Sequence, residues 1–245
     1  MDAQFLIFLA VGAAMGGFVN GLAGFGTALF TLGWWLQVMP PLQAVAISLV
    51  MGVVPGVQGV WIVRRDIDPR RLLLFLIPGF LGIPLGLFIL DMIDARLLKI
   101  VIAGFLLLYG GFFLLRRNLP AIRRRFPLID GGLGFVGGVL GATAGLSGAL
   151  PTMWLAMQDL TKGQSRALLQ PYNTAVLGVA AILLAVDGVY QGQTLHAALI
   201  ALPVTLLAAQ AGIWTFGRLN DLQFRRLLII LMFLSGILLI LREAF

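Results

Sequence analysis

The sequence predicts an all-α polytopic membrane protein built from two homologous halves, and three observations support that prediction. First, 60% of the 245 residues are hydrophobic and 11% are charged, whereas soluble domains carry roughly 25% charged residues. Second, no charged side chain lies between Asp2 and Arg64, and about 20 apolar residues already cross the hydrocarbon core of a bilayer. Third, one glycine-rich motif occurs twice in the chain.

The repeated motif defines the two halves. GGFVNGLAGFGTA (residues 16–28) aligns without gaps with GGVLGATAGLSGA (137–149), at an offset of 121 residues. Gln43 aligns with Gln164 at the same offset, so the register continues beyond the glycines. A duplication of this kind dictates the architecture. We therefore predict an N-terminal half at residues 1–118, a cytoplasmic linker at 119–124 and a C-terminal half at 125–245.

Each half is predicted to contain four hydrophobic elements, the first of them long and glycine-rich. In the first half they cover residues 3–39, 42–63, 71–91 and 95–115. In the second half they cover residues 130–158, 165–186, 193–216 and 223–241. The segments end where prolines, glycines and charged residues gather, as in RRDIDPRR at 64–71 and DGVYQGQ at 187–193.

The first element of each half has two alternative arrangements. As one straight helix, residues 3–39 would extend about 56 Å, nearly twice the roughly 30 Å of the hydrocarbon core. The element must therefore tilt, protrude, or fold back at its glycines as two half-helices. In the first arrangement every element crosses the membrane. In the second, each glycine-rich element is a broken, re-entrant helix and the two halves are inverted repeats.

The charges of the connecting loops favour the folded-back arrangement. Arginines at 64–71 and in the central linker place both loops in the cytoplasm, because basic loops stay inside. If all eight elements crossed, Arg218, Arg225 and Arg226 would lie outside, against this rule. With re-entrant hairpins they lie inside, and the 187–193 turn, which has no Lys or Arg, lies outside. Eight simple crossings remain the alternative.

The glycine motifs have a packing interpretation and a functional one. Pairs such as Gly17 and Gly21 let neighbouring helices approach closely. Packing explains the cluster of Gly24 and Gly26 less well, because each glycine costs about 1 kcal/mol relative to alanine inside a helix. Non-helical backbone at membrane depth occurs where it is buried in protein or lines a wet cavity. Two such breaks at matching positions in two halves indicate a transporter site.

A helix that begins at such a break directs unpaired N–H groups and its positive dipole end at the site, which suits an anion. Hydroxyl groups of Thr27 and Ser147 would add donors, and Asn173 either lines the site or hydrogen-bonds between helices. Because no basic side chain is expected inside the apolar segments, we expect a cage of hydroxyls and amides. Lys162 and Arg166 either attract the anion or set the topology. The predicted substrate-binding residues are Asn20, Gly24, Phe25, Gly26, Thr27, Thr143, Gly145, Ser147, Gly148 and Asn173.

The composition also argues against other classes of protein. The chain has no cysteine and a single histidine, His196, so it lacks the usual residues of a metal centre or thiol chemistry. No carboxylate is expected within the spans, which disfavours an intramembrane enzyme. Basic loops account for the net charge of +7 without nucleic acid. We predict no enzyme activity, cofactor or metal; the partners are a small anion and the lipid bilayer. A homo-oligomer and a non-transporting membrane scaffold are left open.

The two motifs, together with KGQSRALL at 162–169 and Asn173, resemble the TauE/SafE family over most of the chain. The resemblance implies a multi-pass transporter of the bacterial inner membrane that exports sulfite or an organosulfonate. The first motif departs from the commoner family pattern of three successive glycines, because Phe25 and Thr27 interrupt it. The anion is therefore not assigned by the resemblance, and a permease for a different small anion remains an alternative.

Overall fold

The computed structural model describes residues 2–115, 122, 126–158, 160–220, 223, 227 and 230, and the regular structure of this part is helical. In the first half the helices are α1 (Ala3–Ala23), α2 (Thr27–Trp35), α3 (Pro41–Val63), α4 (Pro69–Met92) and α5 (Ala95–Leu115), with a short 3₁₀ turn, η1 (Arg64–Asp66), after α3. In the second half they are α6 (Pro127–Ala144), α7 (Ala149–Ala156), α8 (Lys162–Val186) and α9 (Gly192–Arg218).

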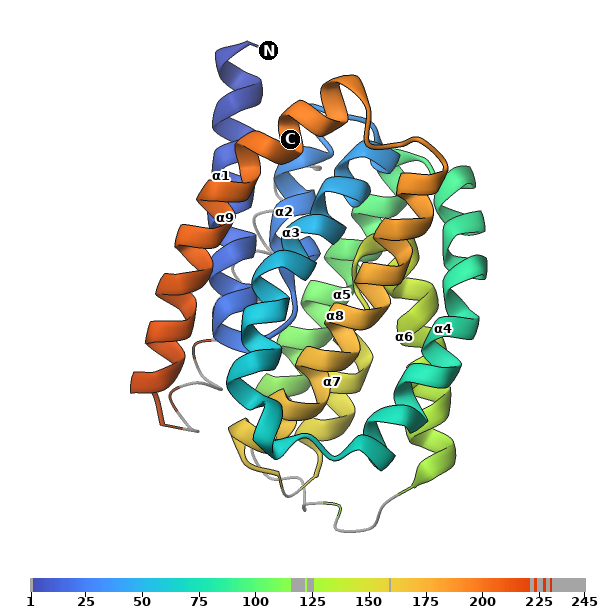
Figure 1. Ribbon diagram of the computed structural model, residues 1–245, viewed down its shortest axis with the longest axis vertical. Helices are drawn as coiled ribbons and strands as arrows, with labels where there is room; N and C mark the ends of the chain where they lie inside the picture. The colour runs from blue at the N-terminus through green and yellow to red at the C-terminus, as the bar shows by residue number, and fades with distance from the viewer. Residues whose placement is uncertain are drawn as a thin grey trace.

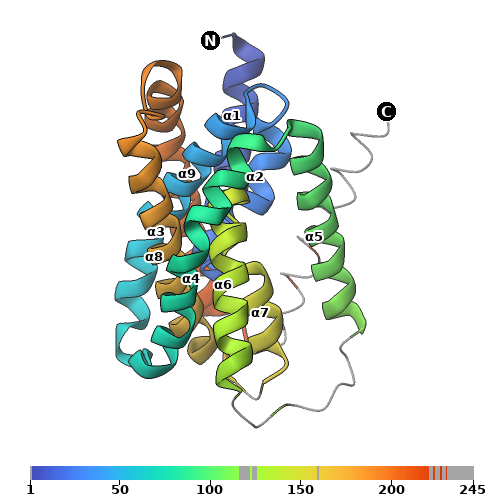
Figure 2. The same cartoon turned by 90° about the vertical axis from the view of Figure 1, so that its right-hand side faces the viewer.

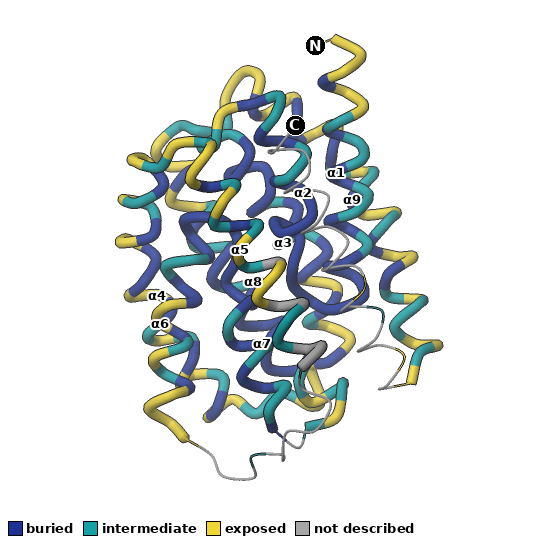
Figure 3. Tube along the Cα trace, turned by 180° about the vertical axis from the view of Figure 1, so that it is seen from behind, coloured by how far each residue is buried: buried dark blue, intermediate teal, exposed yellow. Residues whose placement is uncertain are grey.

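Six helices of the described part are long and apolar enough to cross a membrane: α1, α3, α4, α6, α8 and α9. Their outward faces are apolar, as α4 shows with the exposed side chains of Leu73, Ile77 and Leu81, one turn apart. Figure 3 shows such exposed positions on the outside of the bundle and the buried ones within it. An apolar exterior of this kind suits lipid tails. The chain is therefore a multi-pass membrane protein, as predicted.

Each predicted glycine-rich element is two helices that fold back on each other. The indole Nε1 of Trp35, at the end of α2, donates to the Leu9 carbonyl of α1 at 3.2 Å. The indole Nε1 of Trp154, near the end of α7, donates to the Asp130 carboxylate of α6 at 2.6 Å. Leu9 and Asp130 align at the repeat offset. Both long helices are broken at the predicted glycines, and each short helix returns along the long one.

The breaks follow from backbone conformations that favour glycine. Gly24 and Gly26 have φ angles of 82° and 90°, and Gly145 has a φ of 67°. This left-handed region ends a helix at little cost for glycine, which has no Cβ. Gly26 and Gly148 occupy the N-cap positions of α2 and α7, and neither helix receives a side-chain cap. The glycines of each motif therefore end the long helix, and the short helix that follows starts without a side-chain cap.

The long helices pair across the two predicted halves. α1 packs on α9, α6 packs on α4, and α3 packs on α8. A Cβ on Gly17 would lie 2.5 Å from the Thr205 carbonyl of α9, and one on the aligned Gly138 would collide with the Gly79 carbonyl of α4. These glycines let two backbones touch. The packing interpretation is confirmed at these positions.

The two hairpins enter the bundle from opposite ends. Figure 1 shows α1 beginning at the upper end of the molecule and α6 at the lower end, and the turned view in Figure 2 agrees. The η1 turn lies at the lower end and the turn between α8 and α9 at the upper end. Of the predicted linker 119–124 only Ile122 is described, and most of the predicted element 223–241 lies outside the described residues. The boundaries of the halves stay predictions.

Candidate functional site

The two helix breaks meet inside the bundle. A Cβ on Gly145 would lie 2.6 Å from the Ala28 Cβ, and one on Gly148 would lie 2.7 Å from the Phe25 Cβ. Each break thus touches the first residues of the other hairpin's short helix or the turn before it. The break residues are buried, with Ser147 at 0% and Phe25 at 2% exposure. The repeat therefore places its two irregular segments in one shared, enclosed region.

Asn20 holds the first break together. Its Nδ2 donates to the Thr27 hydroxyl at 2.9 Å and to the Gly52 carbonyl of α3 at 2.9 Å. The Asn20 side chain thereby joins the end of α1 to the start of α2 and to the middle of α3. Its Oδ1 is buried without a hydrogen-bond partner.

Asn173 joins the second break to the first. Its Oδ1 accepts a hydrogen bond from the Ser147 hydroxyl, and its Nδ2 donates to the Gly24 carbonyl at 3.5 Å. Asn173 lies midway along α8 and is 1% exposed. Of its two predicted roles, the structure shows the hydrogen bonds between helices.

The two asparagines occupy exchanged places in the repeat. Asn20 of α1 aligns with Gly141 of α6, and Asn173 of α8 aligns with Gly52 of α3. In the first half the amide side chain comes from the first long helix and donates to the following span, whereas in the second half it comes from the following span and bonds to the break. A Cβ on Gly141 would lie 2.7 Å from the Ser147 Cβ, so that position cannot carry a second asparagine without movement.

One predicted site residue lies apart from the rest. Thr143 donates from its hydroxyl to the Gly86 carbonyl of α4 at 2.8 Å. This bond ties α6 to α4, on the side of α6 that packs against the other half. The remaining predicted residues belong to the two breaks or, as Asn173, contact both of them.

The expectation that the apolar segments hold no basic side chain is wrong for Arg166. This residue is 2% exposed and lies in the second turn of α8. Its Nη2 donates to the Gly21 carbonyl of α1 at 2.9 Å, and its Nε donates to Gln170 Oε1 at 3.3 Å. The guanidinium also stacks on the Phe216 ring of α9, 4.4 Å from the ring centroid. Because α8 begins at Lys162, Arg166 lies within the packed bundle and not in a loop.

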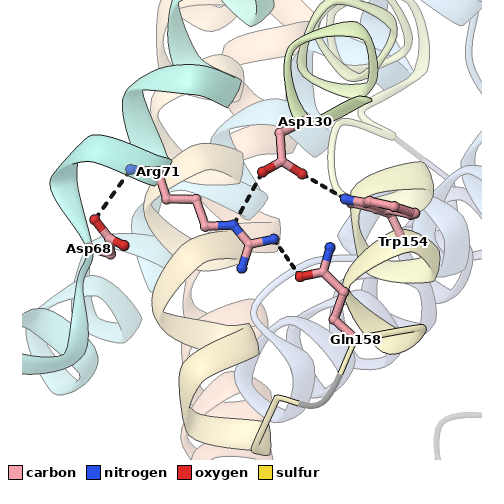
Figure 4. A network of polar contacts seen from close by, with 5 residues as sticks. All are labelled: Asp68, Arg71, Asp130, Trp154 and Gln158. Atoms are coloured by element: carbon pink, nitrogen blue, oxygen red, sulfur yellow. Dashed lines mark hydrogen bonds and ion pairs between the residues drawn. The ribbon is translucent and has the colours of Figure 1, made fainter. Parts of the chain in front are cut away.

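A second buried polar cluster, shown in Figure 4, joins α4, α6 and the end of α7. Arg71 Nε lies 3.3 Å from Asp130 Oδ2, and Arg71 Nη2 donates to Gln158 Oε1 at 2.6 Å. Asp130 accepts a further bond from Trp154. The Asp68 carboxylate accepts from the Arg71 backbone N–H at 3.3 Å and so caps α4. The expectation of no carboxylate within the spans is wrong for Asp130, which lies in the first turn of α6 and is buried.

A surface pocket of about 410 Å³ lies away from the breaks. Its lining includes Asp2, Gln4 and Gln37, at the end of α1 opposite to the first break. The described residues contain no group of three His, Cys, Asp or Glu side chains that could hold a metal ion.

Apolar spans, two matched helix breaks and a polar cluster where these breaks meet define a membrane transporter of the broken-helix class. The chain belongs to the family described as Sulfite exporter TauE/SafE, whose profile matches residues 8–239. Membership in this family makes the chain a membrane transporter and not an enzyme, as the sequence predicts. Neither the curated proteins nor the solved structures compared with the chain gave a match.

Proposed function

We propose that the chain is a permease of the bacterial inner membrane that exports sulfite or an organosulfonate by alternating access. The observation that carries this proposal is the meeting of the two breaks, where Gly145 and Gly148 pack on Ala28 and Phe25. In a family described as sulfite exporters, a paired break of this kind is the natural place for the anion.

The chemistry of the breaks suits an anion. α2 begins without a side-chain cap, so the backbone N–H groups of its first residues remain available to a ligand. At α7 the Ala149 N–H already donates to the Leu146 carbonyl at 3.1 Å and Pro151 has no N–H, so the available amide in its first turn is that of Leu150. Both helices present the positive end of their dipole to the break region. The Thr27 hydroxyl accepts from Asn20 and keeps its own hydrogen to donate to an anion, whereas the Ser147 hydroxyl can donate to an anion once it leaves Asn173.

Alternating access is supported by the way the halves pair. α1 packs on α9 as α6 packs on α4, so each half supplies the partner for the other half's first helix. The hairpins begin at opposite ends, which supports inverted repeats related by an axis near the breaks. Since the break residues are buried, an anion reaches them only when one half moves against the other. Rocking of this kind would open the breaks to one side at a time.

Export of an anion needs no coupled ion in principle. A membrane potential that is negative inside favours outward movement of one negative charge by about 2.3 kcal/mol per 100 mV. The buried carboxylate of Asp130 is paired with Arg71 and so is not free to carry a proton or sodium ion. We therefore propose that the potential drives export.

The test is flux in proteoliposomes loaded with labelled sulfite, sulfoacetate or sulfate, beside an uncharged solute of similar size. We expect at least one sulfur oxyanion to move faster than through empty liposomes, and to respond to an imposed potential. Equal leakage of the uncharged solute, or no anion movement, would contradict the proposed function.

Two variants test whether the flux depends on the breaks. Gly24→Leu and Gly145→Leu put side chains where Gln170 and Ala28 already lie, and at positive φ. We expect both variants to lose most of the flux. The control is Gly132→Leu in α6, where a Cβ meets no atom within 4 Å. Unchanged flux in both break variants would refute a site at the breaks.

A further inference from the structure

One face of α8 carries a polar stripe that runs from the start of the helix to the breaks. Lys162, Arg166, Gln170 and Asn173 follow one another at helical spacing, and the last three are buried. The aligned positions at the start of the other half's equivalent helix are Pro41, Val45, Leu49 and Gly52. In the first half, α3 therefore packs at these positions with small or apolar residues. The polar stripe of α8 in the second half is an addition that packing does not require.

Arg166 is a buried cation without a counter-charge among the described residues. Its two hydrogen bonds go to neutral oxygens, of Gly21 and of Gln170, and its Nη1 has no hydrogen-bond partner. The ion pair found in the described part of the chain joins Arg71 to Asp130. Taking a charge out of water is unfavourable unless the charge is paired. An arginine kept in this state inside a membrane bundle indicates a function.

Gln170 adds a second unsatisfied donor beside the first break. Its Oε1 accepts from Arg166, while its Nε2 is buried without a partner. The Gln170 amide also touches the backbone of the break, because a Cβ on Gly24 or on Gly59 of α3 would collide with it. Buried polar atoms are normally hydrogen-bonded, so two neighbouring unpaired donors call for an acceptor. An oxyanion offers several acceptor oxygens and the missing charge.

We propose that Arg166 and Gln170 form the charged part of the substrate site, and that they take a small oxyanion of one negative charge with at least two acceptor oxygens. A sulfonate and hydrogensulfite both have this chemistry. The inference rests on the proposed transport function and names the groups that recognise the anion. The single uncompensated charge of Arg166 matches a monoanion and leaves a dianion with one charge unpaired.

Lys162 marks the entry to this site. Its ammonium lies over the same Phe216 ring as Arg166, at 4.7 Å from the centroid, and donates to the Phe216 carbonyl at 3.2 Å. Lys162 is partly exposed, whereas Arg166 is buried one turn further along α8. An anion would therefore meet the lysine first and the arginine next. The Gly24 break follows.

The decisive variant is Gln170→Glu, which has nearly the same shape. The new carboxylate would lie where Oε1 already accepts from Arg166, so it would pair with the guanidinium and keep the packing. We expect the thermal unfolding midpoint in detergent to hold or rise, while sulfite flux, measured where hydrogensulfite is present, falls at least tenfold. If Arg166 were only a tie between α8, α1 and α9, the pairing would leave flux unchanged.

Charge removal gives the matched comparison. Arg166→Gln should lose flux to a similar degree, and Arg166→Lys should keep part of it, since the charge remains without the guanidinium fork. Arg218→Gln is the control: Arg218 is exposed at the end of α9 and stacks on Trp214. We expect its flux to stay near that of the wild type.

A binding measurement tests the site separately from transport, in case a variant loses flux only because it folds poorly. Sulfite should raise the unfolding midpoint of the wild type and of Arg218→Gln, and should have a markedly smaller effect on Arg166→Lys. Wild-type protein that moves no anion would overturn the proposed function. Wild-type flux together with unchanged flux in Gln170→Glu and Arg166→Gln, or an equal sulfite effect on Arg166→Lys, would overturn this inference alone.

Discussion

Two asparagines connect the backbone breaks to the helices around them. Asn20 reaches from α1 to the Gly52 carbonyl of α3, and Asn173 reaches from α8 to Ser147 and Gly24. The sequence predicts both residues as members of the site. Their exchanged placement against Gly141 and Gly52 could not be predicted, because it depends on which helices touch.

Replacing Asn20 by leucine should destabilise the protein. The change keeps the side-chain volume but removes the donor to Thr27 and Gly52, and a lost buried hydrogen bond costs about 1–2 kcal/mol. We expect a lower thermal unfolding midpoint in detergent. The matched control is Gln58→Leu, which removes an exposed amide pair with Gln210 and should change stability by less than about half as much. Equal loss in both variants would contradict the role given to Asn20.

Arg166 shows the limit of prediction at the level of single residues. A charged residue near the edge of an apolar run is normally a loop residue. If the helix begins one turn earlier than expected, the same residue lies inside the packed bundle. The structure starts α8 at Lys162, with Thr161 capping the helix through its side chain and Gln164 completing the capping box. The T-x-x-Q pattern at 161–164 was the sequence signal that could have found this start.

Each broken element consists of a long helix and a short helix that together form a hairpin. α2 has 9 residues and α7 has 8, each about 12–14 Å long and far too short to span a bilayer. Glycine conformations and helix length together predict the break, and the segment bounds agree closely with the predicted ones elsewhere, as in α3 at Pro41–Val63. Which side of its long helix each short helix takes could not be predicted, since that depends on contacts such as Trp35 to Leu9.

The Arg71 to Asp130 pair should hold the second hairpin onto α4. Asp130→Asn leaves a buried guanidinium without its partner, which typically costs about 3–5 kcal/mol. We expect a clearly lower unfolding midpoint in detergent for this variant. Arg70→Gln, at an exposed neighbouring position, is the control and should have little effect. A midpoint for Asp130→Asn within error of the wild type would show that the pair does not hold the hairpin.

At the scale of the whole molecule, we propose that the two halves have opposite orientations in the membrane, so that their hairpins reach the shared breaks from opposite sides. The duplication itself could be predicted from the aligned motifs. The pairing of α1 with α9 and of α6 with α4 could not, because partners distant in sequence leave no pattern in a single chain. The charge of the connecting loops predicts which end of the bundle faces the cytoplasm.

The most direct measurement of that claim is single-cysteine labelling in intact cells, which is simple because the chain has no cysteine of its own. Arg65→Cys and Gln191→Cys place thiols at exposed positions at opposite ends of the bundle. With inverted halves, a membrane-impermeant maleimide should label Gln191→Cys at once and Arg65→Cys only after permeabilisation. Labelling of both positions from the same side would contradict the account.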